Sequence, residues 1–463
     1  MKYLIPALLF SFIAFNGVFA QQEGHDIVLE IKGIEADTAY LGYHLDGKTY
    51  IQDTVQVVNE EARFKSDEQL EAGMYFLYTP NGIFFEFLIK DQFFSIKADK
   101  SNIPGTAVVS GSKEVELFIN LQRQMTQFQK ESRDLQQQLS LPQADSAKII
   151  DQIRSKDAEN KKVSRNLAQE NSGTLFSQVI TLMDRPSDIE APEGLDERDA
   201  QIFIYQEYKR RFWEEIDLTE AGIVRTPLFL PRLKEYFEKV VPTHPDSLNA
   251  ALDGFLSRDM APEVFQYSLM TMVNLYANSK IMGMDAVYVH LVDNYYAKGK
   301  ATWTDETTLT RMKQNSSRIR TLLIGKPAPD FSIPDVDGNL VSPLSLPEDY
   351  VILFIYDSGC GHCKKAAPKM VTAYENLKNS LSIDLLTVNL SENETEWKEF
   401  IEKYGLSGTN LGDLAGTSNI GYYYYVNTTP QIYILDKERK IIAKKLGAGQ
   451  IEDFFSNYLK VSQ

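Results

Sequence analysis

The sequence contains two cysteines, Cys360 and Cys363, and only two residues separate them. An apolar, β-rich stretch at 350–356 precedes the pair, and a helical pattern at 364–377 follows it. A Cys-x-x-Cys motif at a strand-to-helix turn predicts the local fold and indicates redox chemistry. The N–H groups at the start of a helix favour a thiolate, so we expect a low pKa for Cys360. The second sulfur, one helical turn further on, can close a small ring and release a mixed disulfide.

The alternative for this pair is a structural disulfide. Cysteines so close in sequence close a very small loop, which stabilises a domain less than a long loop does. The redox interpretation is therefore favoured. A metal site is not predicted, because the five histidines are scattered along the chain and ligands for zinc or iron would have to converge.

Residues 1–20 have the features of a secretory signal peptide. Lys2 supplies the positive start, and an apolar run at 4–15 follows. Small residues, or residues tolerated by the signal peptidase, occupy the cleavage positions 18–20. The apolar run is short for a membrane helix, and no later stretch is long and apolar enough to span a bilayer. We therefore expect export to the periplasm, in a soluble or peripherally membrane-associated form, with no integral membrane segment.

The rest of the 463-residue chain is too long for one hydrophobic core, so several domains are expected. The net charge of −16 argues against nucleic acid as a partner, because a basic surface is needed to neutralise phosphates. Overall, the fold class predicted is multidomain α+β.

Residues 21–112 are predicted to form an antiparallel β-sandwich-like domain. Short strand patterns recur there at the spacing typical of such domains. Asn81-Gly82 lies between apolar runs at 75–78 and 83–89, which is the pattern of a β-hairpin.

Residues 113–322 are predicted to form an all-helical domain. Its first helix carries a heptad-like apolar stripe made of Phe118, Leu121, Met125, Phe128, Leu135 and Leu139. Packing of this stripe on a neighbouring helix of the same chain is the favoured interpretation. A coiled-coil dimer is the alternative, so a homo-oligomer formed through the helical domain remains open.

Residues 323–463 show the order β, β, α, β, α, β, β, α. The best-defined segments are strands at 351–356, 383–389 and 431–435 and helices at 364–377 and 396–404. Strands that alternate with helices and end in a hairpin and a helix predict a mixed α/β sheet covered on both faces.

This last region resembles the thioredoxin-fold domains of the TlpA/ResA-like, redoxin-related group. The resemblance rests on Ala328-Pro329-Asp330-Phe331 with Asp337-Gly338, on the two cysteines, and on Thr429-Pro430 before the strand at 431–435. It implies a thioredoxin fold for 323–463 and a thiol–disulfide oxidoreductase activity. The two earlier domains are similar, more loosely, to the β-rich and helical modules that precede such domains in some exported bacterial proteins.

The resemblance also implies roles for individual residues. Cys360 would be the nucleophile and Cys363 the resolving cysteine. Pro430 would be a cis-proline against the disulfide, a bond type uncommon enough to imply a purpose. The backbone of Thr429 would then be free to pair with an extended substrate segment.

The dipeptide between the cysteines, Gly361-His362, is the one found in protein disulfide isomerases. A charged His362 would stabilise the thiolate and make the disulfide more oxidising. The direction in which the thiol–disulfide reaction runs in the cell therefore stays open between reductase, oxidant and isomerase, with reductase favoured. The expected partners are protein thiols or disulfides and an unidentified thiol–disulfide electron donor, and the chemistry needs no cofactor.

The sequence departs from the family at three positions, and at one of them Gly359 stands where a tryptophan often precedes the first cysteine. The acids that related proteins carry near the cysteines would fall on Phe354 and Ala366, so the group that handles the proton of Cys363 is open. A peroxidase of the peroxiredoxin type is set aside, because its activating threonine would fall on Asp357. A binding or assembly protein with a tethered thioredoxin-like domain is the remaining alternative.

Overall fold

The computed structural model of the chain describes residues 23–141 and 145–461. The predicted signal peptide, residues 1–20, lies outside the described residues. The described residues form two compact units, which divide between Arg232 and Leu233. The region predicted to be helical therefore contributes helices to both units, and the domain boundaries at 112 and 322 stay predictions. Within the described ranges, no helix is long and apolar enough to cross a membrane.

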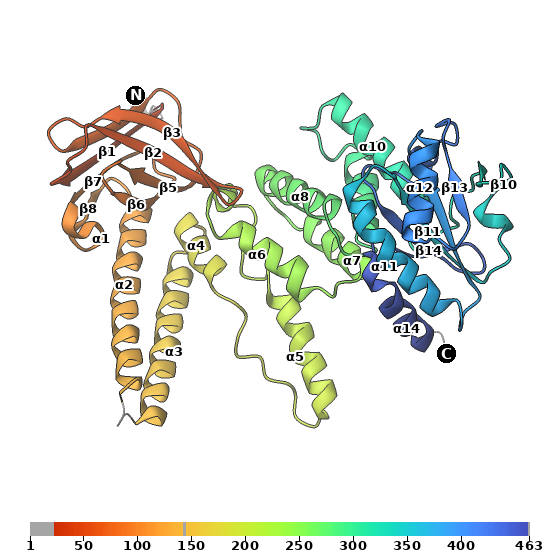
Figure 1. Cartoon of the computed structure of the whole chain (residues 1–463). Helices are drawn as coiled ribbons and strands as arrows, with labels where there is room; N and C mark the ends of the chain where they lie inside the picture. Colours follow the sequence, from red (N-terminus) through yellow and green to blue (C-terminus); the bar gives the residue numbers. More distant parts are fainter. Residues whose placement is uncertain (1–22, 142–144, 462–463) are drawn as a thin grey trace, which may run out of the picture. The chain divides into compact units, whose positions relative to one another are not determined.

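The first unit begins with two four-stranded sheets (Figure 1), whose strand orders are β4-β1-β7-β8 and β3-β2-β5-β6. The strands are β1 (His25–Lys32), β2 (Thr38–Leu45), β3 (Lys48–Gln56), β4 (Glu61–Ser66), β5 (Gly73–Tyr78), β6 (Phe84–Ile89), β7 (Phe93–Asp99) and β8 (Val108–Ser110). Every second residue of β1 is buried, and Ile27 and Leu29 share one core with Leu41 and Leu77 of the other sheet. The predicted hairpin is present, since β5 and β6 pair antiparallel.

One strand pair differs from the antiparallel arrangement that the sequence predicts. β1 and β7 pair in parallel, with Ile27 opposite Phe94 and Leu29 opposite Ile96. β7 returns to the first sheet only after the chain has built the other sheet, and such a long connection allows the parallel direction. The alternation of apolar residues reports which face is buried and carries no information on strand direction.

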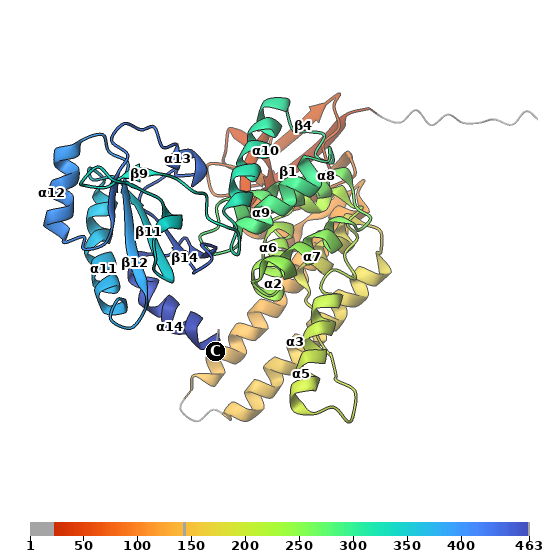
Figure 2. The same cartoon turned by 90° about the vertical axis from the view of Figure 1, so that its right-hand side faces the viewer.

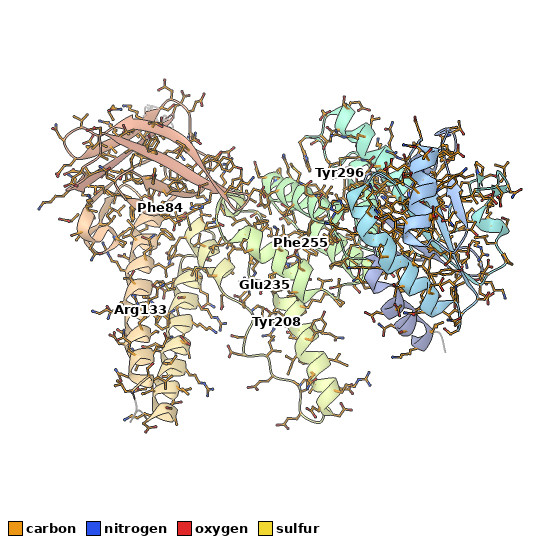
Figure 3. The ribbon with its side chains drawn as sticks, in the orientation of Figure 1. Phe84, Arg133, Tyr208, Glu235, Phe255 and Tyr296 are labelled. Atoms are coloured by element: carbon orange, nitrogen blue, oxygen red, sulfur yellow. The ribbon has the colours of Figure 1, made fainter. Side chains whose placement is uncertain are left out.

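The helices of the first unit follow the sheets. They are η1 (Lys100–Asn102), α1 (Ile103–Thr106), α2 (Lys113–Leu139), α3 (Ser146–Glu170), α4 (Leu175–Met183), α5 (Glu197–Arg211), η2 (Ala221–Arg225) and α6 (Phe229–Glu235), which runs into the second unit. α2 and α3 lie side by side (Figure 1), and Asn160 of α3 approaches the Met125 sulfur at 3.8 Å. Glu131 and Lys156 form an ion pair between the same helices, and Arg133 is exposed on α2 (Figure 3). α3 is thus a neighbouring helix of the same chain, and it contacts the predicted stripe at Met125.

The second unit opens with a helical layer. Its elements are the π-helical turns η3 (Tyr236–Val240) and η4 (Val292–Tyr296) and the helices α7 (Pro245–Leu256), α8 (Pro262–Ala277), α9 (Asp285–Leu291) and α10 (Glu306–Thr321). Phe255 and Tyr296, both labelled in Figure 3, are buried. Asp293 in η4 accepts hydrogen bonds from Ser316 (2.8 Å) and Arg320 (2.6 Å), which fixes α10 in the layer.

The remainder of the second unit is built on a five-stranded sheet of order β13-β12-β11-β14-β15. Its strands are β11 (Tyr350–Tyr356), β12 (Ile383–Asn389), β13 (Asn410–Gly412), β14 (Gln431–Leu435) and β15 (Ile441–Lys444), and a small hairpin, β9 (Ile333–Pro334) with β10 (Leu340–Val341), precedes them. β11 pairs in parallel with β12 and antiparallel with β14, so the sheet is mixed, as predicted.

Both faces of this sheet are covered. One face carries α11 (Gly361–Leu377), α12 (Glu394–Tyr404) and α14 (Ile451–Val461), visible in Figure 2. The other face is covered by the segment 322–333 and by α13 (Ile420–Tyr423). Successive residues of β11 point to opposite cores, Ile352 to one and Leu353 to the other, which is why this strand is one continuous apolar run.

Candidate redox site

The turn between β11 and α11 places Cys360 at the start of a helix. Cys360 is the N-cap residue of α11, with an extended backbone (φ −71°, ψ 124°). Its carbonyl accepts the Lys364 amide at 3.1 Å, and its own amide donates to the Asp357 carbonyl at 3.1 Å. The Asp357 carboxylate accepts the Gly359 amide at 2.7 Å. These bonds hold the cysteine where the first N–H groups of the helix have no partner within the helix.

The Cys360 thiol is partly exposed and lies against the loop before β14. The thiol donates to the Thr429 carbonyl, with Sγ and O 3.6 Å apart. A hydrogen bond from the Thr429 side chain, followed by those from the backbone N–H groups of Cys363 and His362, lowers the pKa of Cys360 to about 7. The expectation of a low pKa from helix-start N–H groups is thus supported, and Thr429 adds the largest contribution.

Cys363 has the opposite environment. Its side chain is fully buried against the sheet, and burial raises the pKa of the Cys363 thiol to about 11. At neutral pH about half of Cys360 is therefore thiolate, whereas nearly all of Cys363 carries its proton.

The other predicted site residues lie around the same turn. The Thr429–Pro430 peptide bond is cis, and both residues are half-buried. Gly361 and His362 are exposed, and a Cβ added at Gly361 would meet nothing within 4 Å. The structure thus brings Thr429 to Cys360 and leaves the Gly361-His362 dipeptide open to solvent, while the roles of these residues in exchange remain predictions.

The two positions where related proteins carry acids hold a buried aromatic ring and a small apolar side chain. Phe354 is stacked on Tyr356, with ring centroids 5.2 Å apart. The Tyr356 hydroxyl lies near the side chains of Thr387 and Trp397 but has no hydrogen bond of good geometry in the described part of the chain. Buried hydroxyls without a hydrogen-bond partner are uncommon in proteins. The layer under the cysteines is therefore partly polar through Tyr356, although it contains neither of the acids that related proteins carry.

Sequence reasoning missed Glu396, which lies at the rim of the turn. Its Oε1 is 3.7 Å from Lys364 Nζ and 3.7 Å from the position of a Cβ built on Gly359. The local signal was present, since Asn393 caps α12 by accepting the Glu396 amide at 3.1 Å. That signal predicts where the helix begins, but it does not reveal that this end of α12 lies beside the cysteines.

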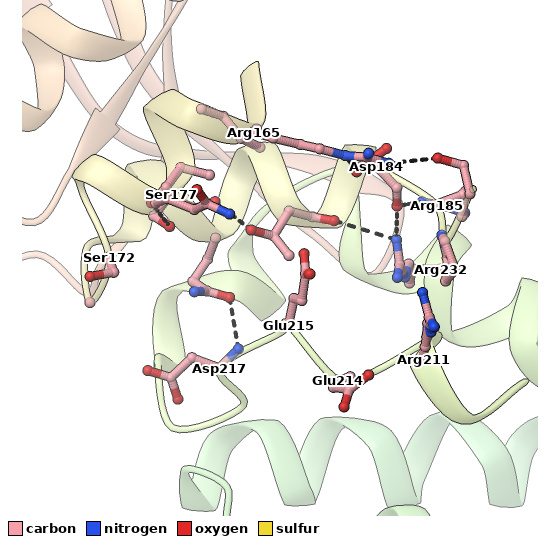
Figure 4. Close-up of a pocket in the computed structure, with 18 of the residues that line it drawn as sticks. Arg165, Ser172, Ser177, Asp184, Arg185, Arg211, Glu214, Glu215, Asp217 and Arg232 are labelled. Atoms are coloured by element: carbon pink, nitrogen blue, oxygen red, sulfur yellow. Dashed lines mark hydrogen bonds and ion pairs between the residues drawn. The ribbon is translucent and has the colours of Figure 1, made fainter. Parts of the chain in front are cut away.

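The first unit contains a separate cavity of about 760 Å³ (Figure 4), which the sequence did not predict. Its charged groups largely bind one another or the backbone. Arg165 donates to Asp184 at 2.6 Å, the buried Arg232 donates to the Asp184 carbonyl, and Gln178 accepts the Asp217 amide at 2.8 Å. These residues come from segments far apart in the sequence, so no local sequence pattern predicts the cavity. Neither cysteine lines it.

No group of three or more His, Cys, Asp or Glu residues within 23–141 and 145–461 is arranged to hold a metal ion.

Comparison with known proteins matches two regions of the chain to families. Residues 324–444 match the AhpC/TSA family, and residues 26–118 match a domain of unknown function, DUF4369. A thiol-disulfide oxidoreductase ResA of Bacillus cereus is 29% identical over 137 residues, which are 30% of this chain and 77% of that protein. ResA of Bacillus subtilis (strain 168) is 24% identical over 137 residues, 30% of this chain and 74% of that protein.

Solved structures also resemble the chain. A domain of a possible thiol-disulfide isomerase from Cytophaga hutchinsonii is 31% identical, covers 30% of this chain and 95% of that chain, and has a TM-score of 0.29. A thioredoxin-like protein from Bacteroides caccae is 18% identical, covers 60% of this chain and 98% of that chain, and has a TM-score of 0.48.

The geometry of the turn, the AhpC/TSA match and the ResA relatives together define the class of protein. The C-terminal domain has a thioredoxin fold, and the protein is a thiol–disulfide oxidoreductase. Within that class, the domain is of the TlpA/ResA-like, redoxin-related kind, which confirms the resemblance seen in the sequence.

Proposed function

We propose that this protein is exported and exchanges thiols and disulfides with protein substrates through Cys360 and Cys363. In the reducing direction, the Cys360 thiolate attacks one sulfur of a substrate disulfide and displaces the other sulfur as a thiolate. Cys363 then loses its proton and attacks the Cys360 sulfur of the mixed disulfide. The second substrate sulfur leaves, and both substrate thiolates take up from solvent the two protons that Cys360 and Cys363 released to it. The substrate has then gained two electrons and two protons, and Cys360 and Cys363 have become a disulfide.

One observation supports this proposal above the others, namely the different ionisation of the two thiols. A pKa of about 7 makes Cys360 a nucleophile at neutral pH, and a pKa of about 11 keeps Cys363 protonated until the mixed disulfide brings a reactive sulfur beside it. A structural disulfide needs no such difference.

The remaining site residues have proposed roles in the same reaction. Pro430 and the backbone of Thr429 would receive an extended substrate segment, and the open Gly361-His362 dipeptide would let the partner approach. An external thiol–disulfide donor would reduce the Cys360–Cys363 disulfide after each cycle. Reduction of substrates is the favoured direction, and isomerase or oxidant use is the alternative.

A trapping experiment tests the exchange. In the Cys363→Ser variant, the mixed disulfide at Cys360 should accumulate with a reduced–oxidised protein mixture and be seen by non-reducing electrophoresis and mass spectrometry. The Cys360→Ser variant is the matched control and should trap nothing. If wild-type protein does not reduce insulin and the Cys363→Ser variant traps nothing, the thioredoxin-like domain would be a tether of a binding or assembly protein.

The direction is tested by equilibration with glutathione. A reduction potential near that of thioredoxin, about −270 mV, would support the reductase, whereas a value near that of protein disulfide isomerase, about −180 mV, would support isomerase or oxidant use. Export is tested separately by N-terminal sequencing of the mature protein, which should begin just after Ala20 if residues 1–20 are removed.

A further inference from the structure

We propose that Arg318, which lies outside the redox domain on α10, is a positioning residue for the loop that carries Thr429 and Pro430. The inference rests on the proposed function of the Cys360 site and adds a residue from the helical layer to it.

The first evidence is the direct contact between α10 and the aromatic run before the cis-proline. The Arg318 guanidinium lies over the Tyr422 ring at 4.8 Å from its centroid and over the Tyr425 ring at 4.9 Å. Figure 2 shows α10 and α13, which contains Tyr422, as neighbours in the second unit. A guanidinium between two rings is attracted to both faces, so it holds the two tyrosines at a fixed separation.

The second evidence is the backbone of Tyr425. Its φ of 48° lies in the left-handed region, which bulky side chains rarely adopt and which persists only where the surroundings support it. Arg318 holds its ring, and the Gln431 side chain donates to its carbonyl at 3.3 Å. Only three residues separate Tyr425 from Thr429, so a shift of Tyr425 would move the group that contacts Cys360.

The third evidence is that α10 itself is firmly held. Arg320 forms a bidentate ion pair with Asp293 of the helical layer. Beside the end of α10, Lys444 of β15 is buried, pairs with Asp285 of α9 and donates to the Leu322 carbonyl. Arg318 therefore projects from a fixed frame onto the loop, which is the arrangement that positioning requires.

The test compares full-length variants of two arginines on the same helix. Arg318→Ala removes the contact with the tyrosines, whereas Arg320→Ala removes only an ion pair within the helical layer and controls for a general loosening of α10. Arg318→Lys keeps a cation and should restore part of the effect. Thermal unfolding identifies variants that fail to fold, and Tyr425→Phe, which keeps the ring, is a second folded comparison.

Three measurements report the position of the loop. Arg318→Ala should lower the rate of iodoacetamide alkylation of Cys360 at pH 7 at least twofold, because the Thr429 hydroxyl, which lowers the pKa of Cys360, would stabilise the thiolate for only part of the time. It should also speed hydrogen exchange of the amides at 425–429 relative to Arg320→Ala. In insulin reduction, KM should rise more than kcat falls, since the loop is where an extended substrate would pair.

The outcomes separate this inference from the proposed function. If Arg318→Ala and Arg320→Ala give the same alkylation profile and the same exchange at 425–429, Arg318 does not position the loop. Alkylation and hydrogen exchange need no substrate disulfide, so they decide the role of Arg318 even if wild-type protein proves unable to reduce insulin, a result that would overturn the proposed function alone.

Discussion

Replacing Thr429 with valine removes one hydroxyl while keeping the shape of the side chain. That hydroxyl makes the largest contribution to the low pKa of Cys360, which is about 7. A hydrogen bond to a charged group contributes roughly 1.5 kcal/mol or more, and 1.36 kcal/mol corresponds to one pH unit in a pKa. We therefore expect Thr429→Val to raise the pKa of Cys360 by about one.

The expected consequence is a slower reaction at neutral pH. With a pKa near 7, about half of Cys360 is thiolate at pH 7, and with a pKa near 8 only about a tenth would be, so alkylation at pH 7 should slow about fivefold. The assay is the rate of iodoacetamide labelling of reduced protein between pH 5 and 10, followed by mass spectrometry. Cys363 will not interfere, because it is buried and its pKa is about 11.

Two variants control this prediction. Thr429→Ser keeps the hydroxyl and should retain the midpoint of the wild-type profile. Thr428→Val removes the neighbouring, exposed hydroxyl and should leave the midpoint unchanged. If Thr429→Val titrates like wild type, the hydroxyl does not stabilise the thiolate, and the helix-start N–H groups alone would have to account for the acidity.

Three further outcomes are expected. Cys363→Ser should keep the alkylation profile of Cys360 near neutral pH yet lose steady-state insulin reduction, because no second thiol resolves the mixed disulfide. His362→Pro should make the reduction potential more negative, by up to about 90 mV in equilibration with glutathione, and an unchanged potential would exclude a role for the imidazole. Lys444→Met should destabilise the protein by about 3–5 kcal/mol in denaturant titration, since it leaves the carboxylate of Asp285 buried without its partner. Combining it with Asp285→Leu should recover most of that loss, and failure to do so would show that the pair is not the cause.

The sequence predicted the redox domain closely because its strands are buried on both faces. Continuous apolar runs mark such strands, and the runs at 383–389 and 431–435 have the same bounds as β12 and β14. The short β13 (Asn410–Gly412) has no such run and was not predicted. The helix after the cysteines begins at Gly361, earlier than the pattern at 364–377 indicates, because the first turn of a helix needs no apolar stripe.

Contacts between distant segments could not be predicted in the same way. Nothing local to Arg318 indicates that it lies between Tyr422 and Tyr425, because the helical period shows which face of α10 is apolar and not what that face meets. The parallel pairing of β1 with β7 is of the same kind. The effect of the Thr429 hydroxyl on the pKa of Cys360 was not predicted, because the family resemblance implies a role for the Thr429 backbone only.

The different ionisation of the two cysteines follows from where α11 begins. Cys363, Ala367, Met370 and Tyr374 recur at helical spacing, and all are buried against the sheet. Cys363 is thus the first member of the apolar stripe, and its high pKa is the cost of that burial. Cys360 precedes the stripe as the N-cap residue, where its sulfur meets free N–H groups and solvent. The three-residue step keeps both sulfurs on one side of the helix, about one turn apart. A single helix start therefore yields a partly exposed acidic thiol and a buried protonated one within reach of each other.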